Sequence, residues 1–543
     1  ATSSEIALLE AHRPPQNPVR GDSAAAAAAY SSITGALRSR AEHRANCTGA
    51  AEPPLAMPDF LARLLLFLLA VGLRVHLYPL AKLAGGYRRY KPDPDSILVT
   101  CCTNGLGHVH QMERVLGELE AAGLRFPVIV LAKEQKVPAY KLASLKKRFP
   151  DAKFVNLNWE VDYDDGKSFQ NSKIVWSATK SFTAMAPQMA RKVSALLRTH
   201  RPAYCLSFWE PGVAMFIDIL NAPTKVVAVA SQGQIYADKE AGYDKNVLLR
   251  GVLQAVVGRR GTLVPLSVNE IPGAIPQIVN LGEAQPAGDY FVAYTTAPQV
   301  LSPIKKKLKG RVLLFVKEKR LPYYKRVYRK YPHVELRPTT PDFAEYLARS
   351  KGLIASPSRG VVTQAVALGK PVYLFCPKGH IEQEYNLQFY LKHFAGVSCP
   401  RARRYRRYVK GAKRGGKLPD GWRGALQSIT EWEAAVPSLD LKAQAAELRG
   451  WLDRIDPLIR SRLLPLLTPT DEERAAMGGG ADEPAAAAAA DLPAEEEEDL
   501  PEEEEEEEEE DDDDDLDEDD AANASRGDAA AAGGGGGGAA AAA

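Results

Sequence analysis

The stretch ILVTCCTNGLGHVHQMERVL, residues 97–116, joins an unbroken apolar run to an amphipathic segment through a turn that contains two glycines. The apolar run is typical of a buried β-strand, and the apolar spacing after the turn is that of an α-helix. Gly105 and Gly107 allow the backbone to turn tightly between the two elements. Strand, glycine turn and helix in this order predict the first unit of a parallel α/β sheet.

The same alternation of apolar runs and helix-length segments continues to about residue 400. We interpret one set of apolar runs as buried strands, at 96–102, 127–132, 153–159, 204–209 and 225–231. A second set begins near residue 290, with strands at 290–296, 311–318, 352–357 and 371–377. We expect the main helices at 111–123, 186–200, 211–221, 360–369 and 384–394. Two sets in series predict an α/β fold with two Rossmann-like domains that face a shared cleft, where the strands end.

Composition divides the whole chain into six parts. We expect a disordered or targeting extension over 1–56, a hydrophobic membrane-associating segment over 57–90, a first Rossmann-like domain over 91–280, a second over 281–420, closing helices over 421–468 and a disordered acidic tail over 469–543. The proline-containing stretch 262–289 is the expected hinge between the two domains.

The net charge of +1 conceals two opposing parts of the chain. Residues 491–520 contain 24 Asp and Glu and no Lys or Arg, so the rest of the chain carries a formal charge of about +25. Lys and Arg are densest at 305–330 and 401–417. Such a surface suits phosphates, anionic lipid headgroups or nucleic acid; the alternative is a solvated face, or one partly neutralised by the acidic tail.

The apolar segment FLARLLLFLLAVGL, residues 60–73, is too short for an ordinary spanning helix, which needs roughly 20 residues. A signal-peptide core, a short anchor, an interfacial helix and a buried core helix all remain open. The six cysteines have no metal-ligand spacing and read as free thiols. We therefore expect a membrane-associated or organellar protein whose active domain faces a reducing compartment.

The glycine turn of the opening stretch is a poor dinucleotide site. Its third glycine is missing, because His110 stands three positions after Gly107. The turn does place His108 at a helix N-terminus, where the helix dipole favours the neutral imidazole that a general base needs. The alternative is a histidine that only caps the turn.

A second constellation runs over 356–386. It begins with a small-residue loop that opens a helix, and a helix N-terminus beside Arg359 suits a pyrophosphate. Glu382, Gln383 and Asn386 follow the next strand, and these donors and acceptors suit a polyhydroxylated ligand. Taken singly, each of these features is also common in purely structural turns.

Together these motifs resemble those of GT-B glycosyltransferases that use nucleotide sugars, particularly the bacterial N-acetylglucosaminyl transferase of peptidoglycan synthesis and the UDP-glycosyltransferases. The amino domain of that family opens with strand–GxGH–helix, which 105–108 match. Its carboxyl domain has a small-residue loop, a helix ending in G-K-P, a strand and then E/D-Q-x-x-N, which 356–371 and 382–386 match. The resemblance covers about 95–400.

The resemblance implies an acceptor domain over 91–280 and a donor domain over 281–420. His108 would be the base or positioner, and Glu210 would orient it or bind the acceptor. Donor-binding residues would be Ser358, Arg359, Gly360, Thr363, Gln364, Glu382, Gln383 and Asn386. Gly105, Gly107 and Gln234 would form the acceptor-side loops. Gln364 departs from the family, which usually has a glutamate there that binds the ribose.

The implied reaction is transfer of a sugar, hexosyl or N-acetylhexosaminyl, from a nucleotide sugar (a UDP-sugar by resemblance) to a hydroxyl acceptor, with inversion. It requires no metal or other cofactor beyond the co-substrate. The string at 162–165 resembles a metal-binding DxD motif. The apolar segment and basic surface favour a lipid or membrane-presented acceptor and an anionic membrane surface, and we expect no nucleic-acid partner. A UDP-sugar epimerase or phosphorylase of the same fold, and a non-catalytic nucleotide-sugar-binding or scaffold protein, are the alternatives.

Overall fold

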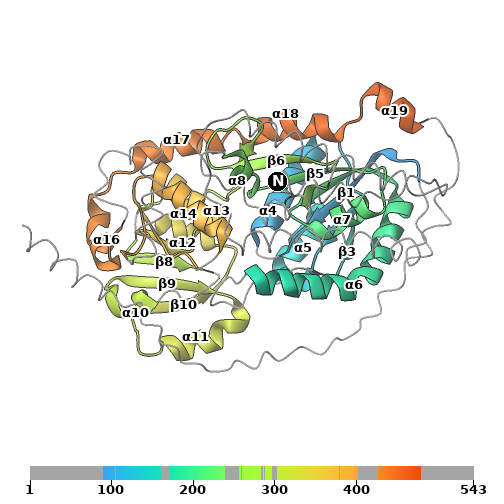
Figure 1. Cartoon of the computed structure of the whole chain (residues 1–543). Coiled ribbons are helices and arrows are strands. Elements are labelled where there is room, and N and C mark those ends of the chain that lie inside the picture. Colours follow the sequence, from blue (N-terminus) through green and yellow to red (C-terminus); the bar gives the residue numbers. More distant parts are fainter. Residues whose placement is uncertain are drawn as a thin grey trace, which may run out of the picture. The chain divides into compact units, whose positions relative to one another are not determined.

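The computed structural model describes residues 90–103, 106–159, 171–238, 260–282, 288–295, 302–377, 380–401 and 426–478, with a few positions between these ranges. They contain two parallel β-sheets, each covered by helices, and a C-terminal set of helices (Figure 1). The apolar segment 60–73, the string at 162–165 and the acidic run 491–520 lie outside the described residues.

The first sheet has the strand order β3-β2-β1-β4-β5-β6-β7, with every pair parallel. Its strands are β1 (Asp93–Cys101), β2 (Val128–Leu131), β3 (Lys153–Asn156), β4 (Pro202–Phe208), β5 (Lys225–Ala230), β6 (Thr262–Ser267) and β7 (Ile275–Pro276). Between them lie α4 (Leu106–Ala121), α5 (Ala139–Arg148), α6 (Asn171–His200), α7 (Pro211–Ile219) and α8 (Gly233–Ala237).

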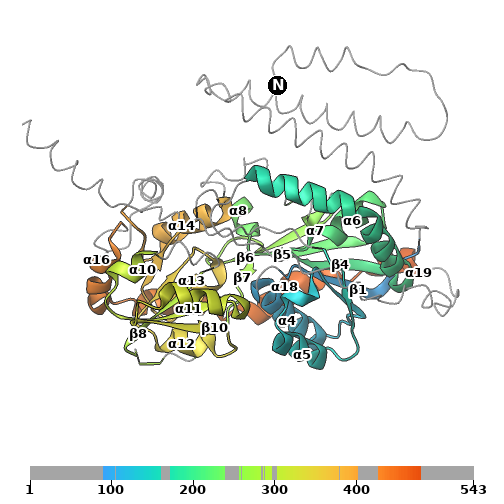
Figure 2. The same ribbon diagram turned by 90° about the horizontal axis from the view of Figure 1, so that it is seen from below.

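Side chains of β1 alternate between the two faces of this sheet, as a period of two requires. Ile97 and Val99 are buried in a core with α4 and α5, whereas Leu98 is buried in a second core with α6 and α7. Figure 2 shows α6 and α7 on one side of the sheet and α4 and α5 on the other. Coverage on both faces explains why the strands read as unbroken apolar runs.

The second sheet has the order β10-β9-β8-β11-β12-β13, again with parallel pairs. Its strands are β8 (Tyr290–Tyr294), β9 (Arg311–Val316), β10 (Val334–Pro338), β11 (Leu353–Ala355), β12 (Val372–Leu374) and β13 (Val397–Ser398). Its helices are α10 (Ser302–Lys307), α11 (Leu321–Tyr328), α12 (Phe343–Arg349), α13 (Arg359–Ala367) and α14 (Ile381–His393). One face packs on α12, α13 and α14, and the other on α10, α11 and α16 (Ile429–Ala435).

The C-terminal helices connect the second sheet back to the first. Trp451 of α17 (Lys442–Leu452) lies in the core of the second sheet, whereas Ile459 and Leu463 of α18 (Ile455–Leu467) lie in the core that contains α4. Arg460 of α18 also pairs with Glu118 of α4 at 2.9 Å. Two Rossmann-like sheets in series, with helices that return to the first, confirm the predicted GT-B fold class.

Several boundaries differ from the sequence-based expectations. The expected hinge 262–289 contains β6 and β7, and Pro265 pairs in the sheet opposite Ala230. The expected disordered tail from 469 begins with a helix, α19 (Asp471–Gly478), whose Arg474 pairs with Asp95 at 3.0 Å. The sequence did not predict the strand that contains Pro265 or the helix α19, because the residues with which these two segments pair lie far away in the sequence.

Across the described ranges, no helix combines the length and the apolarity that crossing a membrane requires. The five cysteines among them are buried, and none forms a disulfide.

Candidate functional site

The order of strands reverses once in each sheet. Predicted site residues come after the strands at these two reversals. The reversal lies between β1 and β4 in the first sheet and between β8 and β11 in the second. His108 and Glu210 follow β1 and β4, and Ser358 and Arg359 follow β11. Ligands of open α/β sheets bind at such switch points, at the carboxyl ends of the strands.

The first turn of α13 is open to an anion. Ser358 is its N-cap, with extended backbone angles and no hydrogen bond from its side chain to the helix. A Cβ atom built on Gly360 would meet no heavy atom within 4 Å. The first N–H groups of a helix lack partners within the helix and carry its positive dipole end. This turn can therefore receive a phosphate through its backbone.

Arg359, the first residue of α13, is only 4 % exposed. Its Nε donates to Oδ1 of Asn386 at 2.8 Å, and its Nη1 donates to Oε1 of Gln234. The guanidinium lies 5.4 Å from the ring centroid of Tyr385. The sequence predicted a cation that faces the ligand, and the structure shows a buried one that both sheets hold in place.

The guanidinium of Arg359 lacks an anionic partner among the described residues. Both of its hydrogen-bond acceptors are neutral amides, and its Nη2 is buried without a hydrogen-bond partner. A buried charge is costly unless it is paired and fully hydrogen-bonded. An anion that reached Nη2 would supply the missing partner.

Residues of α14 fix Arg359 and the loop before it. Nδ2 of Asn386 donates to the carbonyl oxygen of Pro357 at 2.9 Å. The hydroxyl of Tyr390 lies 2.8 Å from Oγ1 of Thr363 and donates to the carbonyl oxygen of Arg359 at 3.2 Å. Burial raises the pKa of Tyr390 to about 12, so that its hydroxyl keeps its proton at neutral pH. The contacts of Asn386 and Thr363 are therefore those of positioning residues, and their direct contact with a donor stays a prediction.

The segment Ser231–Gln234 connects the predicted acceptor and donor sides. Ser231 Oγ accepts from Nε2 of Gln111 on α4 at 3.0 Å and donates to Oε1 of Gln277 at 2.9 Å. Nε2 of Gln232 donates to Oε2 of Glu382 on α14 at 3.2 Å. Gln234, which is 1 % exposed, is the acceptor for Arg359. The sequence identified Gln234 as an acceptor-side residue, and the structure shows it bonded to the donor side.

His108 lies on the first turn of α4 and is half-buried. It stands three residues before Gln111, so the two side chains share a face of the helix. His110 is exposed, as expected from its different position around the helix. Gly107 has open space where a side chain would lie, and Gly105 is outside the described residues. The role of His108 in catalysis stays a prediction.

Glu210 is fully buried and caps α7. Its Oε1 and Oε2 accept from the backbone N–H groups of Gly212 at 2.6 Å and Val213 at 2.9 Å. Both carboxylate oxygens therefore stabilise the helix start. The catalytic role proposed for Glu210 stays a prediction, and the contacts that we observe favour a structural role.

Two glutamines of the predicted donor site differ in their surroundings. Nε2 of Gln364 donates to the carbonyl oxygen of Asn280, in the segment before the second sheet, and the residue is 6 % exposed. Gln383 is 8 % exposed, and its Oε1 is buried without a hydrogen-bond partner. Gln364 thus holds the connecting segment with its donor group, whereas the Oε1 of Gln383 has no hydrogen-bond partner among the described residues.

The G-K-P turn lies at the amino end of β12, away from the site. Gly369 has φ of 67°, a left-handed conformation that glycine adopts without strain. The N–H of Lys370 returns to the carbonyl oxygen of Ala365 at 2.9 Å, which ends α13. Burial lowers the pKa of Lys370. This motif therefore terminates a helix rather than binding the donor.

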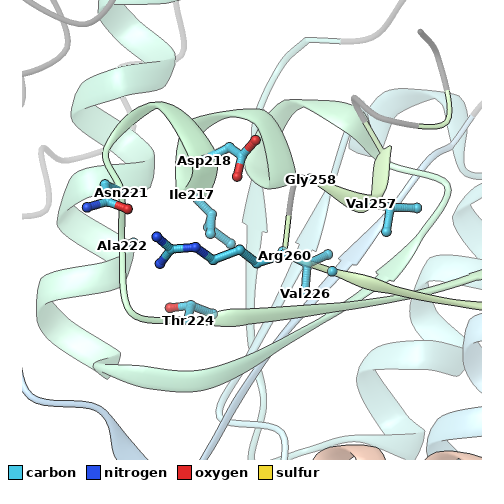
Figure 3. A pocket seen from close by; sticks show the side chains of 10 residues that line it. Ile217, Asp218, Asn221, Ala222, Thr224, Val226, Val257, Gly258 and Arg260 are labelled. Carbon is cyan, nitrogen blue, oxygen red and sulfur yellow. The ribbon is translucent and has the colours of Figure 1, made fainter. Parts of the chain in front are cut away.

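Figure 3 shows a small pocket at the opposite, amino edge of the first sheet, with the Arg260 side chain extended across it. Asp218, Asn221 and Thr224 also line it, beside the start of β5. Its volume is about 20 Å³, which is room for a water molecule and not for a nucleotide. In the described part of the chain, no three His, Cys, Asp or Glu side chains gather closely enough to hold a metal ion.

The sequence did not identify Gln111 and Tyr385 as members of this network. Gln111 is a polar residue at a buried position of α4, which was a usable signal. Tyr385 donates to Oδ2 of Asp238 at 2.8 Å, a contact between residues 147 positions apart. No local pattern predicts such a pair.

No family model and no curated protein matches the chain. One solved structure of similar arrangement is LpCGTa in complex with UDP. Its sequence is 12 % identical, the match covers 70 % of this chain and 100 % of that chain, and the TM-score is 0.43. Others are the spinosyn rhamnosyltransferase SpnG (13 %, 68 % and 100 %, TM-score 0.41) and the glycosyltransferase SnogD from Streptomyces nogalater (15 %, 68 % and 99 %, TM-score 0.39). Similarity at this level carries no functional assignment, which must come from the residues of this chain.

Proposed function

We propose that this chain is a glycosyltransferase that moves a sugar from a nucleotide-sugar donor to a hydroxyl acceptor. One observation carries the proposal: Arg359 is buried at the start of α13 with neutral partners and an unbonded Nη2, beside an open helix N-terminus. A diphosphate fits this place, because it accepts from both the guanidinium and the backbone N–H groups.

The second sheet would hold the donor. The diphosphate binds at Ser358, Arg359 and Gly360, and the sugar hydroxyls reach Glu382 and Gln383. Gln383 supports this assignment, since its buried Oε1 lacks a partner among the described residues and a sugar hydroxyl could donate to it. A UDP-sugar is the donor we propose, by resemblance of the motifs to the UDP-glycosyltransferases.

The first sheet would hold the acceptor near His108. In the proposed step the acceptor oxygen attacks the anomeric carbon as the bond from that carbon to the diphosphate oxygen breaks. The nucleoside diphosphate leaves with the bonding electrons, and His108 takes the acceptor proton. Attack opposite the leaving group inverts the anomeric centre. Arg359 and the α13 dipole stabilise the charge on the departing diphosphate, so we propose that no metal ion is needed.

We also propose a lipid or membrane-presented acceptor and a membrane-associated location. The apolar segment 60–73 and the high basic charge of the chain outside 491–520 support both proposals. Binding to anionic vesicles should weaken at high salt if the basic surface contributes.

A nucleotide-sugar panel tests the proposal. The full chain is heated with UDP-glucose, UDP-galactose, UDP-N-acetylglucosamine, GDP-mannose and uridine, each at saturating concentration. A ligand that binds only the folded protein raises its melting temperature. We expect one UDP-sugar to stabilise the chain well above uridine and to be consumed when an acceptor extract is added. Activity that persists in EDTA would support the metal-free step, and no response to any nucleotide sugar would contradict the proposal.

A further inference from the structure

We infer that the basic surface of the second sheet is a docking surface for the acidic run 491–520 of the same chain. The surface, called here the α11 face, consists of Lys309, Lys325, Arg326, Arg329 and Lys330. All five are exposed, and none forms an ion pair within the described ranges. This inference does not depend on the proposed function.

The helix that carries most of the α11 face is packed against the second sheet. Tyr324 and Tyr328 of α11 are buried in a core with Ile304 of α10. Nζ of Lys305, also on α10, lies 5.2 Å from the ring centroid of Tyr328. The two helices therefore form one surface beside the edge of the second sheet, as Figures 1 and 2 show for α11 and β10.

The cations of the α11 face repel one another. Lys325 and Arg329 stand four residues apart, and so do Arg326 and Lys330. Arg329 is the C-cap of α11 and Lys330 follows it, so the four cations gather around the end of the helix, where like charges repel. The dipole at the C-terminus of α11 offsets a part of this repulsion. An anionic segment bound to the α11 face would remove the remaining repulsion.

Another basic helix end in this protein is neutralised internally, and the contrast shows what α11 lacks. The last turn of α5 carries Lys146, Lys147 and Arg148. Lys146 pairs with Glu134 at 3.0 Å, and Arg148 pairs with Glu120 at 3.1 Å. The stretch 305–330 contains Glu318 as its single acidic residue. The part of it that carries most of the α11 face, 321–330, contains no acidic residue, so the counter-charge for these four cations must come from another segment.

The acidic run is the best-suited source of that counter-charge. It holds 24 Asp and Glu with no Lys or Arg, and it begins 13 residues after Gly478, the last described residue. An extended chain spans ~3.3 Å per residue, so the 24 residues from Gly478 to Glu502 reach up to ~80 Å. A compact chain of about 400 residues has a radius of gyration of only ~21 Å. Attachment through such a linker gives an effective concentration up to the millimolar range, which a separate anionic partner rarely has.

Docking of the acidic run would cover the α11 face and exclude other anions from it. A phospholipid surface is the alternative occupant, and it would need the acidic run to be displaced first. Because both partners are exposed and charged, the contact should weaken steeply as salt rises.

A zero-length carbodiimide cross-linking experiment on the full chain tests the inference. The reagent joins lysine amines to carboxylates in direct contact, and mass spectrometry identifies the joined peptides. We expect cross-links from Lys325 and Lys330 to 502–515 in low salt, reduced at least fivefold in 0.5 M NaCl. Changing Glu502–Glu510 to glutamine should reduce them at least fivefold. A mixture of isotope-labelled and unlabelled chains should give cross-links within one chain.

The matched control changes the other basic helix end. The variant K146S/K147S/R148S should keep the cross-links to Lys325 and Lys330. Vesicles of phosphatidylcholine with 30 % phosphatidylserine supply the second readout. The glutamine variant should bind them at least fivefold more tightly than the wild type, and K325S/R326S/R329S/K330S should abolish that gain. Cross-links spread evenly over exposed lysines, cross-links between chains, or equal vesicle binding by wild type and glutamine variant would overturn the inference.

Discussion

Gln234 of α8, the short helix after β5 of the first sheet, accepts a hydrogen bond from Nη1 of Arg359, the first residue of α13 in the second sheet. The residues are 125 positions apart, and both are almost fully buried. A neutral amide satisfies the geometry of the guanidinium and leaves its charge uncompensated. Among the described residues Arg359 therefore has no anionic partner, and under the proposed function the diphosphate of the donor would supply one.

The variant Gln234→Glu should give Arg359 an anionic partner within the protein. The new carboxylate would pair with Arg359 and compete with the diphosphate, while the acceptor for the Val268 N–H at 3.2 Å is kept. We expect UDP affinity to fall at least tenfold, about 1.4 kcal/mol. The new ion pair should offset the loss of the hydrogen bond that Nε2 of Gln234 donates to Oδ1 of Asn269 at 2.7 Å, so that folding stability stays close to that of the wild type. Calorimetric titration and urea unfolding measure the two quantities. Gln277→Glu is the control, since it adds the same charge without touching Arg359. A similar loss of UDP affinity in Gln277→Glu would contradict the prediction.

His108→Ala should lower the rate of transfer without weakening donor binding. A positioned general base contributes roughly 10²- to 10⁴-fold to the rate. We expect kcat to fall by about this range while the Kd for UDP stays within twofold. His110→Ala, at an exposed position two residues on, should leave both quantities unchanged. A kcat of H108A close to that of the wild type would exclude His108 as the base.

Gln364→Glu distinguishes a ribose-binding residue from one that holds the connecting segment. Nε2 of Gln364 donates to the carbonyl oxygen of Asn280, and a carboxylate there would repel that oxygen. We expect the free energy of unfolding to fall by about 1–3 kcal/mol in urea titrations, with no gain in UDP affinity. Tighter UDP binding at unchanged stability would show instead that the side chain reaches the ribose, as the resemblance implies.

Glu210→Ala should act on stability rather than on chemistry. The carboxylate caps α7 through Gly212 and Val213, and loss of a cap costs about 0.5–2 kcal/mol. We expect a lower melting temperature and an unchanged kcat per folded molecule at a temperature where both proteins are folded. If kcat falls a hundredfold under those conditions, Glu210 takes part in the reaction.

The sequence predicted the fold well where local signals were strong. β1, β2, β4 and β5 are buried on both faces, so their apolar runs were unmistakable. β10 at the sheet edge is half-exposed and reads VELRP, which is why it was missed. β6 was hidden by Pro265, whose missing N–H the sheet tolerates at that position.

The site residues were predicted only where their signals are local in the sequence. Arg359 was recognised because a cation in a small-residue loop at a helix start is a local feature. Its burial, and its bond to Gln234, depend on pairing of distant segments. Likewise Glu210 read as a free carboxylate after a strand, and only the direction of its side chain shows that it caps α7.

The proposed function depends on the claim that Arg359 and the start of α13 bind a diphosphate, and a calorimetric comparison can test this. The full chain and Arg359→Lys are each titrated with UDP and with uridine, and circular dichroism checks that both remain folded. We predict that the wild type binds UDP at least a hundredfold more tightly than uridine, and that Arg359→Lys loses at least tenfold in UDP affinity with no change for uridine. Equal affinities of the wild type for UDP and uridine, or UDP binding that Arg359→Lys leaves intact, would contradict the claim.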